Sequence, residues 1–339
     1  MTGMTPTKRP VLITGATGAV GPLVVWKLHN AGYPVCALSR HVPKPGLLPA
    51  GVEVLAADIE DHGAVQSAMQ GVEVAIHLAA LLHIVNPTLD LLEKYEQVNV
   101  RGTINVVEAA LQAGVRRIVF FGTAAVYDDS THQILTEDDE PRPNTFYART
   151  KRQAEDIVLG AKNSNGQPLG TVLRLCAIYG PRMTGRYKDL LAALARGYFV
   201  PIGDGLNRRT LIYEKDAANA AILAAYHPQA AGKIFNVSDG AFHSMNEILA
   251  VMCKALGRTP PRISLPPGPV CCLAGILEDA ARLIGKTIPI GRHTVEKYLK
   301  DVAVDSSRIR NELGFRPEYD LLRGWKETVI EMQRSGRLS

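Results

Sequence analysis

A tyrosine and a lysine four residues apart are the first candidates for chemistry in this sequence. Tyr147 and Lys151 lie in the stretch 145–161, whose apolar spacing is that of a helix. Residues four apart share one helix face, so the phenol and the ammonium should be neighbours. A free tyrosine has a pKa of about 10 and is a poor base at neutral pH, but a nearby cation favours the phenolate. We therefore expect Lys151 to lower the pKa of Tyr147, which then exchanges a proton with a carbinol oxygen while a hydride moves.

A hydroxyl is expected beside this pair. Thr123 closes a predicted strand at 117–121 and would hydrogen-bond the substrate oxygen next to Tyr147. Lys151 could also bond the ribose of a nicotinamide cofactor and so fix its reactive face. The three residues together predict a proton transfer coupled to a hydride transfer.

A glycine turn supplies the expected cofactor site. Gly15, Gly18 and Gly21 follow a predicted strand at 10–14 and open a predicted helix at 20–31. The first allows a tight turn, the second lets the backbone approach a pyrophosphate, and the third permits close helix–strand contact. The free N–H groups of the helix start would face the phosphates. Thr17, Ala19 and Val20 complete the predicted dinucleotide-binding turn.

The end of the second predicted strand, 34–38, bears on which dinucleotide binds. NAD-binding folds usually place a carboxylate there for the ribose hydroxyls, but this chain has Ser39 and Arg40. Arginine pairs with a 2′-phosphate, so NADP is favoured over NAD, although Arg40 could instead stack on adenine or face solvent. Asp58 and Ile59, after the third strand, are placed to touch the adenine; equally, Asp58 could cap the next helix.

Strands and helices alternate through the first two-thirds of the chain. Further strands are predicted at 53–56, 74–78, 171–175 and 233–237, and further helices at 63–70 and 91–113. This rhythm predicts an α/β fold, a Rossmann-type doubly wound parallel sheet with a smaller, discontinuous C-terminal substrate domain. We assign residues 8–181 and 208–250 to the dinucleotide-binding domain, and residues 182–207 and 251–339 to the substrate-binding domain.

The bulk properties exclude several classes of protein. The 339 residues are 46% hydrophobic and 21% charged, with a net charge of +5. This modest charge predicts no nucleic-acid partner, and the longest apolar run is too short to cross a membrane. The five cysteines lack metal-ligand spacing, so no metal site is expected. A cytoplasmic location is the default expectation, because no apolar leader opens the chain.

These motifs, in this order and spacing, resemble the extended short-chain dehydrogenase/reductases of the epimerase/dehydratase group. The resemblance implies that Leu78, Ala79 and Ala80, after His77, lie next to the cofactor. It implies that Asn99 supports Lys151 through water, and that the segment from Arg174 to Arg182 enters the substrate domain. It also implies a homodimer formed by the helices bearing Asn99 and Tyr147.

The residues after Thr123 narrow the choice within the group. Family dehydratases carry an Asp-Glu pair there, whereas this chain has Ala124-Ala125, as suits 4-epimerases and simple ketoreductases. Arg209 matches a family arginine that contacts the nucleotide diphosphate, and a guanidinium fork suits phosphate oxygens. The resemblance therefore implies hydride transfer at the 4-position of a UDP-linked sugar, and Arg40 favours a reductase over an epimerase. The expected substrate contacts are Thr123, Ala124, Tyr179 and Arg209. The family's second nucleotide-binding arginine is not assigned by the motifs, and Arg292 is one candidate for it.

Two other functions stay open at this stage. A hydroxysteroid- or flavanol-type dehydrogenase of the same family would need an apolar pocket, which the segment 266–284 could form. A cofactor-sensing or RNA-binding member without catalysis is disfavoured, because such proteins commonly lack the tyrosine or the lysine and both are present here.

Overall fold

The computed structural model describes residues 8–82, 84, 89–127, 134–283 and 291–338. Its centre is a parallel sheet of seven strands in the order β10-β6-β5-β4-β1-β2-β3. Each predicted strand is present, with bounds that differ by at most two residues: β1 (Val11–Thr14), β2 (Val35–Ser39), β3 (Glu53–Ala56), β4 (Val74–His77), β5 (Arg117–Thr123), β6 (Gly170–Leu175) and β10 (Ile234–Val237). This strand order is that of a Rossmann fold, which confirms the predicted fold class.

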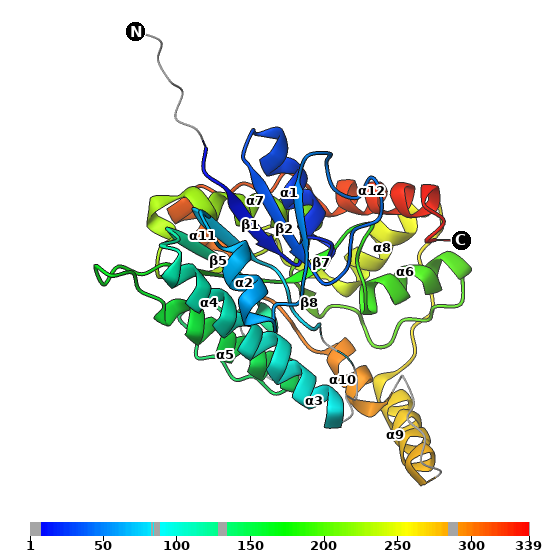
Figure 1. Cartoon of the computed structure of the whole chain (residues 1–339). Helices are drawn as coiled ribbons and strands as arrows, with labels where there is room; N and C mark the ends of the chain where they lie inside the picture. Colours follow the sequence, from blue (N-terminus) through cyan, green and yellow to red (C-terminus); the bar gives the residue numbers. More distant parts are fainter. Residues whose placement is uncertain (1–7, 83, 85–88, 128–133, 284–290, 339) are drawn as a thin grey trace.

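Helices cover both faces of the sheet, which is why inner strands such as β1 and β4 are buried along their whole length. On one face, α2 (His62–Ala68), α4 (Gly102–Gln112) and α5 (Phe146–Gly160) pack against the strands, with Val106 and Ala154 in their shared core. On the other face lie α1 (Gly21–Asn30), α7 (Glu214–Tyr226) and α11 (Ser307–Leu313), with Val25 and Ala221 fully buried among them. Figure 1 shows the two helix layers on either side of the strands.

The helix predicted at 91–113 is interrupted at its middle. It consists of α3 (Leu89–Tyr95), a π-helical turn at Glu96–Arg101, and α4. Wide turns of this kind occur often at functional sites, and this one carries Asn99. Two short 3₁₀ turns also occur, at Ala124–Val126 and Pro228–Ala230.

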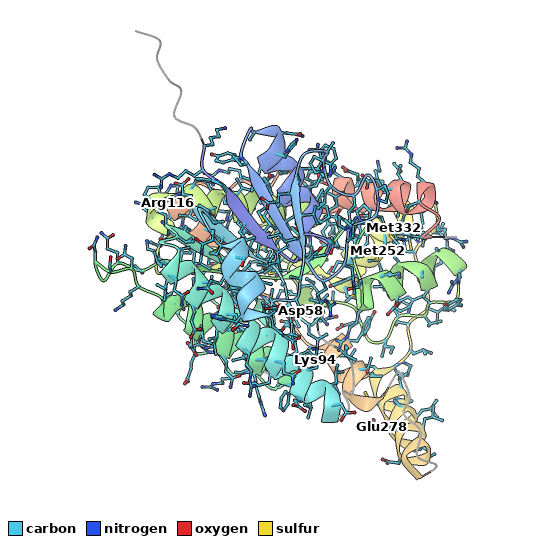
Figure 2. All side chains as sticks on the ribbon, in the orientation of Figure 1. Asp58, Lys94, Arg116, Met252, Glu278 and Met332 are labelled. Atoms are coloured by element: carbon cyan, nitrogen blue, oxygen red, sulfur yellow. The ribbon has the colours of Figure 1, made fainter. Side chains whose placement is uncertain are left out.

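A second core lies beside the carboxyl ends of the strands. It is built from α6 (Arg186–Arg196), α8 (Met245–Ala255) and α12 (Leu321–Arg334), together with the small sheets β7 (Ala177–Tyr179) with β9 (Leu211–Tyr213) and β8 (Arg208–Arg209) with β11 (His243–Ser244). Trp325 is fully buried at its centre. Met252 on α8 and Met332 on α12 lie on facing helices in Figure 2.

The packing moves two of the expected domain boundaries. α8 begins inside 208–250, yet its apolar face, with Ile248 and Met252, belongs to the second core. α11 lies inside 251–339, yet Ile309 and Leu313 pack under β10 with the sheet helices. The chain therefore returns to the Rossmann core near its C-terminus, because α11 covers the strand that closes that edge of the sheet.

Two helices extend from the body near the second core. α9 (Pro267–Leu283) and α10 (Arg292–Leu299) pack on each other, and Figure 1 shows α9 projecting outward. Leu273, Ile276 and Leu277 on α9 are more than half exposed. Of the helices in the described ranges, none is both long enough and apolar enough to cross a bilayer.

Candidate active site

One cavity runs along the carboxyl ends of the strands and into the second core. Its volume is about 1430 Å³, a size that holds a dinucleotide and a second ligand. All the residues that the sequence predicted to hold the cofactor line it: Gly15, Thr17, Gly18, Ala19, Val20, Gly21, Ser39, Arg40, Asp58, Ile59, Leu78, Ala79, Ala80, Tyr147 and Lys151. The far end of the same cavity contains Arg209.

The glycine turn has the geometry that a pyrophosphate requires. Gly15 has φ +69°, and a Cβ there would lie 2.7 Å from the backbone nitrogen of Ala79. A Cβ on Gly21 would lie 2.4 Å from the carbonyl oxygen of Gly15. Side chains at these positions would push the helix start away from the strand, so the turn fits the backbone-lined cradle of a dinucleotide.

Arg182 is a site residue that the motif reading did not assign to the turn. Its Nη2 donates to the carbonyl oxygens of Thr17 and Gly18, at 3.0 and 3.1 Å. The arginine follows β7, so it ties the glycine turn to the second core. The signal was in the sequence, as the last residue of Tyr-Gly-Pro-Arg, but the partner carbonyls are more than 160 positions away.

The adenosine end of the cavity lacks a carboxylate at the tip of β2. Ser39 is buried and donates its hydroxyl to the His41 carbonyl at 2.7 Å, while Arg40 is exposed at the cavity rim. Asp58 also lines the cavity and accepts a hydrogen bond from the Glu60 backbone at 3.2 Å. It does not cap the next helix, since Asp61 does so by accepting from the Ala64 nitrogen.

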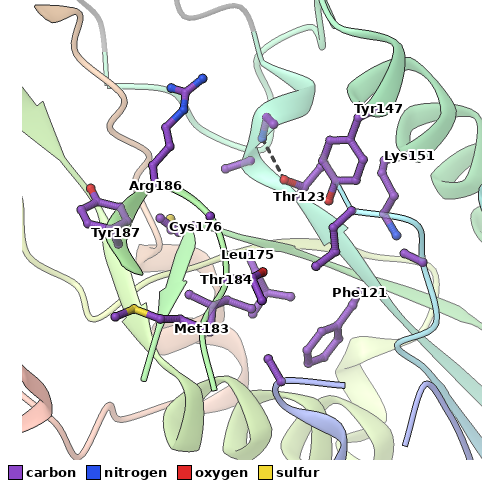
Figure 3. Close-up of a pocket in the computed structure, with 18 of the residues that line it drawn as sticks. Phe121, Thr123, Tyr147, Lys151, Leu175, Cys176, Met183, Thr184, Arg186 and Tyr187 are labelled. Atoms are coloured by element: carbon purple, nitrogen blue, oxygen red, sulfur yellow. Dashed lines mark hydrogen bonds between the residues drawn. The ribbon is translucent and has the colours of Figure 1, made fainter. Parts of the chain in front are cut away.

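The predicted catalytic residues come together at the end of β5. Thr145 caps α5 by accepting from the Ala148 nitrogen, so Tyr147 lies in the first turn and Lys151 in the next. In Figure 3 the Tyr147 phenol reaches toward Thr123, and Lys151 extends beside it from the same helix, with its ammonium over the Phe120 ring. The Thr123 side chain hydrogen-bonds the phenol. The arrangement of Thr123, Tyr147 and Lys151 around one cavity is as predicted.

The expected electrostatics of the pair are wrong in one respect. Burial raises the pKa of Tyr147 to about 12, and the hydrogen bond from Thr123 only partly opposes this. Burial also lowers the pKa of Lys151 to about 7, with the Glu155 carboxylate acting in the opposite direction. Loss of water disfavours both charged forms, and in the cofactor-free protein it outweighs their mutual attraction. Tyr147 is therefore a protonated phenol at neutral pH, a proton donor.

His77 is held neutral beneath the lysine. Its pKa is lowered to about 3 by burial and by the nearby Lys151. Thr103 gives its hydroxyl proton to the Asn99 carbonyl, so it accepts from His77 Nε2, and His77 Nδ1 accepts from Thr14. The same Thr14 oxygen accepts from the Ala79 nitrogen at 3.3 Å, which ties the end of β1 to the loop after β4.

Asn99 is a positioning residue in this structure. Its amide brackets the backbone of Leu81, accepting from the nitrogen at 2.8 Å and donating to the oxygen at 3.1 Å. It also donates to the Thr150 hydroxyl on α5. Tyr95 fixes the next part of the loop, donating to Leu82 O and accepting from Ile84 N. The cavity-lining residues do not include Asn99, and its support of Lys151 through water stays a prediction.

At the end of the cavity far from the glycine turn, the adjacent residues Arg208 and Arg209 have different surroundings. Arg208 is taken up by Asp301, whose carboxylate accepts from its backbone nitrogen at 2.6 Å and its Nη2 at 3.1 Å. Arg209 lines the cavity near Tyr187, with Nη2 donating to the Tyr298 carbonyl at 2.9 Å. Tyr187 and Tyr298 both line the cavity here, and no sequence motif predicted either of them as a site residue. The side chain of Arg292 lies outside the described residues.

Tyr179 was expected to contact the substrate, and this expectation is wrong. Its side chain is fully buried in the second core, stacked on Trp325 at 4.7 Å between ring centroids. It does not line the cavity. Tyr179 is the last residue of β7 and packs in the second core with Met183, so the motif marks the entry to that core.

The comparisons with known proteins agree with this geometry. The model of the NAD-dependent epimerase/dehydratase family matches residues 11–238, about two-thirds of the chain. The chain belongs to this family.

Relatives and solved structures extend the match over nearly the whole chain. A UDP-glucose 4-epimerase of Vibrio cholerae is 28% identical, covering 97% of each chain. A 3β-hydroxysteroid dehydrogenase/decarboxylase of Arabidopsis thaliana is 26% identical, covering 96% of this chain and 80% of its own. The structure of MoeE5 in complex with UDP-glucuronic acid and NAD has a TM-score of 0.74 and 25% identity, covering 96% of this chain and 99% of its own.

The residues that follow Thr123 in the cavity are small and apolar. Ala124 and Ala125 line the cavity after Thr123, where a dehydratase would need its acid and base. Within the described residues, no group of three or more His, Cys, Asp and Glu side chains could hold a metal ion. Thr123, Tyr147 and Lys151 line the same cavity as the glycine turn of this NAD-dependent epimerase/dehydratase family member.

The burial of Lys151 gives a stability prediction. Below pH 7 its ammonium is charged in both the folded and unfolded states, so the fold carries the full burial cost; above 10.5 the amine is neutral in both. We expect Lys151→Met to abolish turnover yet raise the free energy of unfolding at pH 6 by at least about 2 kcal/mol. The gain should shrink as the pH rises from 7 toward 10.5 in urea titrations of the cofactor-free protein.

A matched control is Lys94→Met. Lys94 is well exposed and pairs with Glu60 at 2.6 Å, so its replacement should change stability little and without this pH dependence. Loss of stability in Lys151→Met at pH 6 would show that the lysine is not a buried, strained cation.

Proposed function

We propose that this enzyme transfers a hydride at the 4-position of a UDP-linked sugar, with Tyr147 as the acid/base residue, and that it acts as a reductase that draws on exchangeable NADPH. One observation carries the proposal. A single cavity joins the glycine turn, the Thr123–Tyr147–Lys151 cluster and Arg209. A dinucleotide and a nucleotide-linked substrate can therefore meet at Tyr147 from opposite ends.

The chain's own groups divide the reduction between them. Thr123 and Tyr147 would both hydrogen-bond the carbonyl oxygen of the substrate, which orients the carbonyl carbon. Tyr147, protonated at neutral pH because burial raises its pKa to about 12, would give its proton to that oxygen as the alcohol forms. Lys151 would bond the ribose of the cofactor, and a bound nicotinamide would supply the hydride.

The opposite direction needs a lower tyrosine pKa. A positive charge brought beside the phenol by an oxidised cofactor would favour the phenolate. The cofactor-free protein has the phenol in its proton-donating form, and this supports the reductive direction.

The polar end of the cavity supports a diphosphate-bearing substrate. Arg209 offers a guanidinium at a position where burial lowers its pKa, so an anion there would be bound in a poorly hydrated place. One relative is a UDP-glucose 4-epimerase, and the similar structure of MoeE5 is a complex with UDP-glucuronic acid and NAD. A nucleoside diphosphate is the substrate feature that these observations favour.

A hydroxysteroid-type dehydrogenase is the second candidate, favoured by the Arabidopsis relative. The apolar pocket that it needs was expected from the segment 266–284. The described part of that segment, α9, does not line the cavity and instead projects from the body. The cavity's apolar lining comes from other residues, among them Phe121, Met183, Phe199 and Val295.

The cofactor preference follows from Arg40. Its exposed side chain at the tip of β2 can swing onto a 2′-phosphate, and Ser39 beside it brings no negative charge. Family membership supports an NAD-type cofactor, and we propose NADP as the form this chain prefers. A homodimer through the helices bearing Asn99 and Tyr147, and a cytoplasmic location, stay predictions.

Removal of the phenol hydroxyl tests the reaction. Tyr147→Phe should lower kcat by about 10²–10⁴-fold, because proton donation is lost, while NADP(H) binding survives. Steady-state assays with UDP-sugars and titration calorimetry with the cofactor measure the two effects separately. Undiminished turnover would reject the assignment of Tyr147.

Replacing Arg209 and, as a control, Arg208 by lysine tests whether the substrate carries a nucleoside diphosphate. Arg209→Lys should weaken UDP binding by about tenfold, because an ammonium cannot make the two parallel bonds of a guanidinium. Arg208→Lys is the control, since an ammonium can still pair with Asp301 and UDP affinity should hold. Unchanged UDP affinity in Arg209→Lys, with turnover of a hydroxysteroid, would favour the second candidate.

Calorimetry of both dinucleotides tests the cofactor. The wild type should bind NADP more tightly than NAD, and Arg40→Ala should lose about tenfold for NADP and nothing for NAD. Tighter binding of NAD by the wild type contradicts the role given to Arg40.

A further inference from the structure

A buried carboxylate lies one helical turn beyond the catalytic lysine. Glu155 is four residues after Lys151 on α5 and is fully buried. Arg174 on β6 donates to it from Nε and Nη2, at 3.1 and 2.9 Å, but both bonds go to the same oxygen, Oε2. The other oxygen, Oε1, has no hydrogen-bond partner among the described residues.

The unused oxygen faces the strand that delivers Thr123. A Cβ on Gly122 would lie 2.6 Å from Glu155 Oε1, so the carboxylate rests directly against the backbone of β5. A buried carboxylate with one unpaired oxygen is costly, because water is not there to replace the missing bonds. A residue that destabilises the fold in this way is expected to have a function, and the charge of Glu155 can act on the neighbouring catalytic groups.

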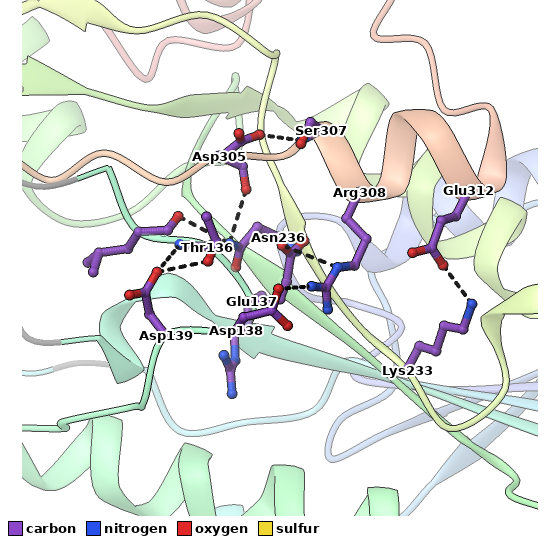
Figure 4. A network of polar contacts seen from close by, with 12 residues as sticks. Thr136, Glu137, Asp138, Asp139, Lys233, Asn236, Asp305, Ser307, Arg308 and Glu312 are labelled. Atoms are coloured by element: carbon purple, nitrogen blue, oxygen red, sulfur yellow. Dashed lines mark hydrogen bonds and ion pairs between the residues drawn. The ribbon is translucent and has the colours of Figure 1, made fainter.

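The arginine on the other side cannot move away. Arg174 Nη1 donates to the Tyr127 hydroxyl at 2.7 Å, and that hydroxyl donates to Asn236 Oδ1 at 3.0 Å. Asn236 is fixed in turn, since its backbone nitrogen donates to Glu137 at 2.7 Å (Figure 4). A chain of polar contacts therefore links the ion pair through Glu137 to Arg308, which bonds Asp138 on the surface at 2.6 Å.

Several titratable or charged groups surround the catalytic pair. His77 on β4 is neutral, Tyr95 on α3 packs with its ring 6.2 Å from that of Tyr147, and the Phe120 ring lies under the Lys151 ammonium at 3.9 Å. Arg174 approaches from β6, and Arg152 on α5 has its Nη1 3.9 Å from Glu155 Oε2. Within this shell, Glu155 is the group that brings negative charge.

We propose that the buried Glu155–Arg174 pair is a positioning element for catalysis, which fixes the charge state of Lys151 and Tyr147. Glu155 favours the proton on both catalytic groups, and Arg174 keeps Glu155 ionised by donating two hydrogen bonds to its Oε2. The catalytic role of this pair rests on the proposed function. The electrostatic effect of Glu155 on Lys151 and Tyr147 does not depend on the identity of the substrate.

The direction of the electrostatic effect agrees with this role. Glu155 raises the pKa of Lys151 against the effect of burial, and it also raises the pKa of Tyr147. Burial raises the pKa of Glu155 itself, but the bonds from Arg174 and the nearby Arg152 and Lys151 act to keep it ionised. Both catalytic pKa values should thus follow the charge at residue 155 in the same direction.

Removing one charge at a time separates this role from a structural one. Glu155→Gln should shift the apparent pKa values of kcat and kcat/KM downward by about one unit. Arg174→Gln should shift them in the same direction, because Glu155 is no longer held ionised and takes up a proton. The double variant should shift them no further than Glu155→Gln does, while the KM for the substrate changes little. A purely structural pair would lower activity equally at all pH values and move neither pKa, which would overturn the proposal.

Charge-conserving variants protect the test from misfolding. Glu155→Asp and Arg174→Lys keep each charge and should keep the wild-type pH profile even where stability falls. If they shift the profile as far as the glutamine variants do, the charge is not the cause and the proposal fails. Thermal unfolding with saturating NADPH shows which variants are folded at the assay temperature.

A substrate-independent measurement separates this inference from the proposed function. NADPH affinity should change near pH 7, where Lys151 titrates in the free protein, and Lys151→Met should remove that change. Calorimetry should find the inflection at a lower pH in both Glu155→Gln and Arg174→Gln than in the wild type. These shifts without turnover of any UDP-sugar would uphold the inference and reject the substrate, whereas an inflection that stays at the wild-type pH in Glu155→Gln would overturn the inference.

Discussion

The removal of water from two neighbouring side chains is the constraint on which the site depends. Tyr147 and Lys151 lie one turn apart on α5, under the loop after β4 and against the end of β5. In water the lysine would favour the phenolate, as simple charge attraction predicts. In the folded protein the loss of hydration acts on both groups in the opposite sense, so each is displaced toward its neutral form. The surrounding structure can be understood as a response to that displacement.

Two groups of contacts surround the pair: hydrogen bonds that fix the backbone after β4, and the buried Glu155–Arg174 ion pair. The Asn99 amide hydrogen-bonds the backbone of Leu81, and the Tyr95 hydroxyl hydrogen-bonds the backbone of Leu82 and Ile84. On the far side, the Glu155–Arg174 ion pair lies inside the core at a position where apolar residues would pack at lower cost. Rigid neighbours of this kind keep the reacting groups in position without reorganisation during the reaction.

The cavity also explains how one fold can serve different substrates. The glycine turn, the tip of β2 and the catalytic helix all belong to the Rossmann core, whereas Arg209, Tyr187 and Tyr298 belong to the second core. Arg182 connects the two by holding the carbonyls of Thr17 and Gly18. The cavity lining near the glycine turn and the lining near Arg209 thus come from different cores, and the second core is built from separate parts of the chain.

The sequence by itself determined the fold class and the family, and the cofactor-site residues it predicted all line one cavity. Glycines at fixed offsets, apolar runs of strand length and a Tyr-x-x-x-Lys spacing are local patterns, and local backbone geometry is enough to place Gly15, Gly18 and Tyr147. Only the tertiary structure decided the rest. It buried Tyr179 against Trp325, separated Arg209 from Arg208, and set Glu155 against Arg174. It also reversed the expected pKa of Tyr147, because a pKa depends on the water excluded by segments that are remote in sequence, and spacing along one helix carries no information about them.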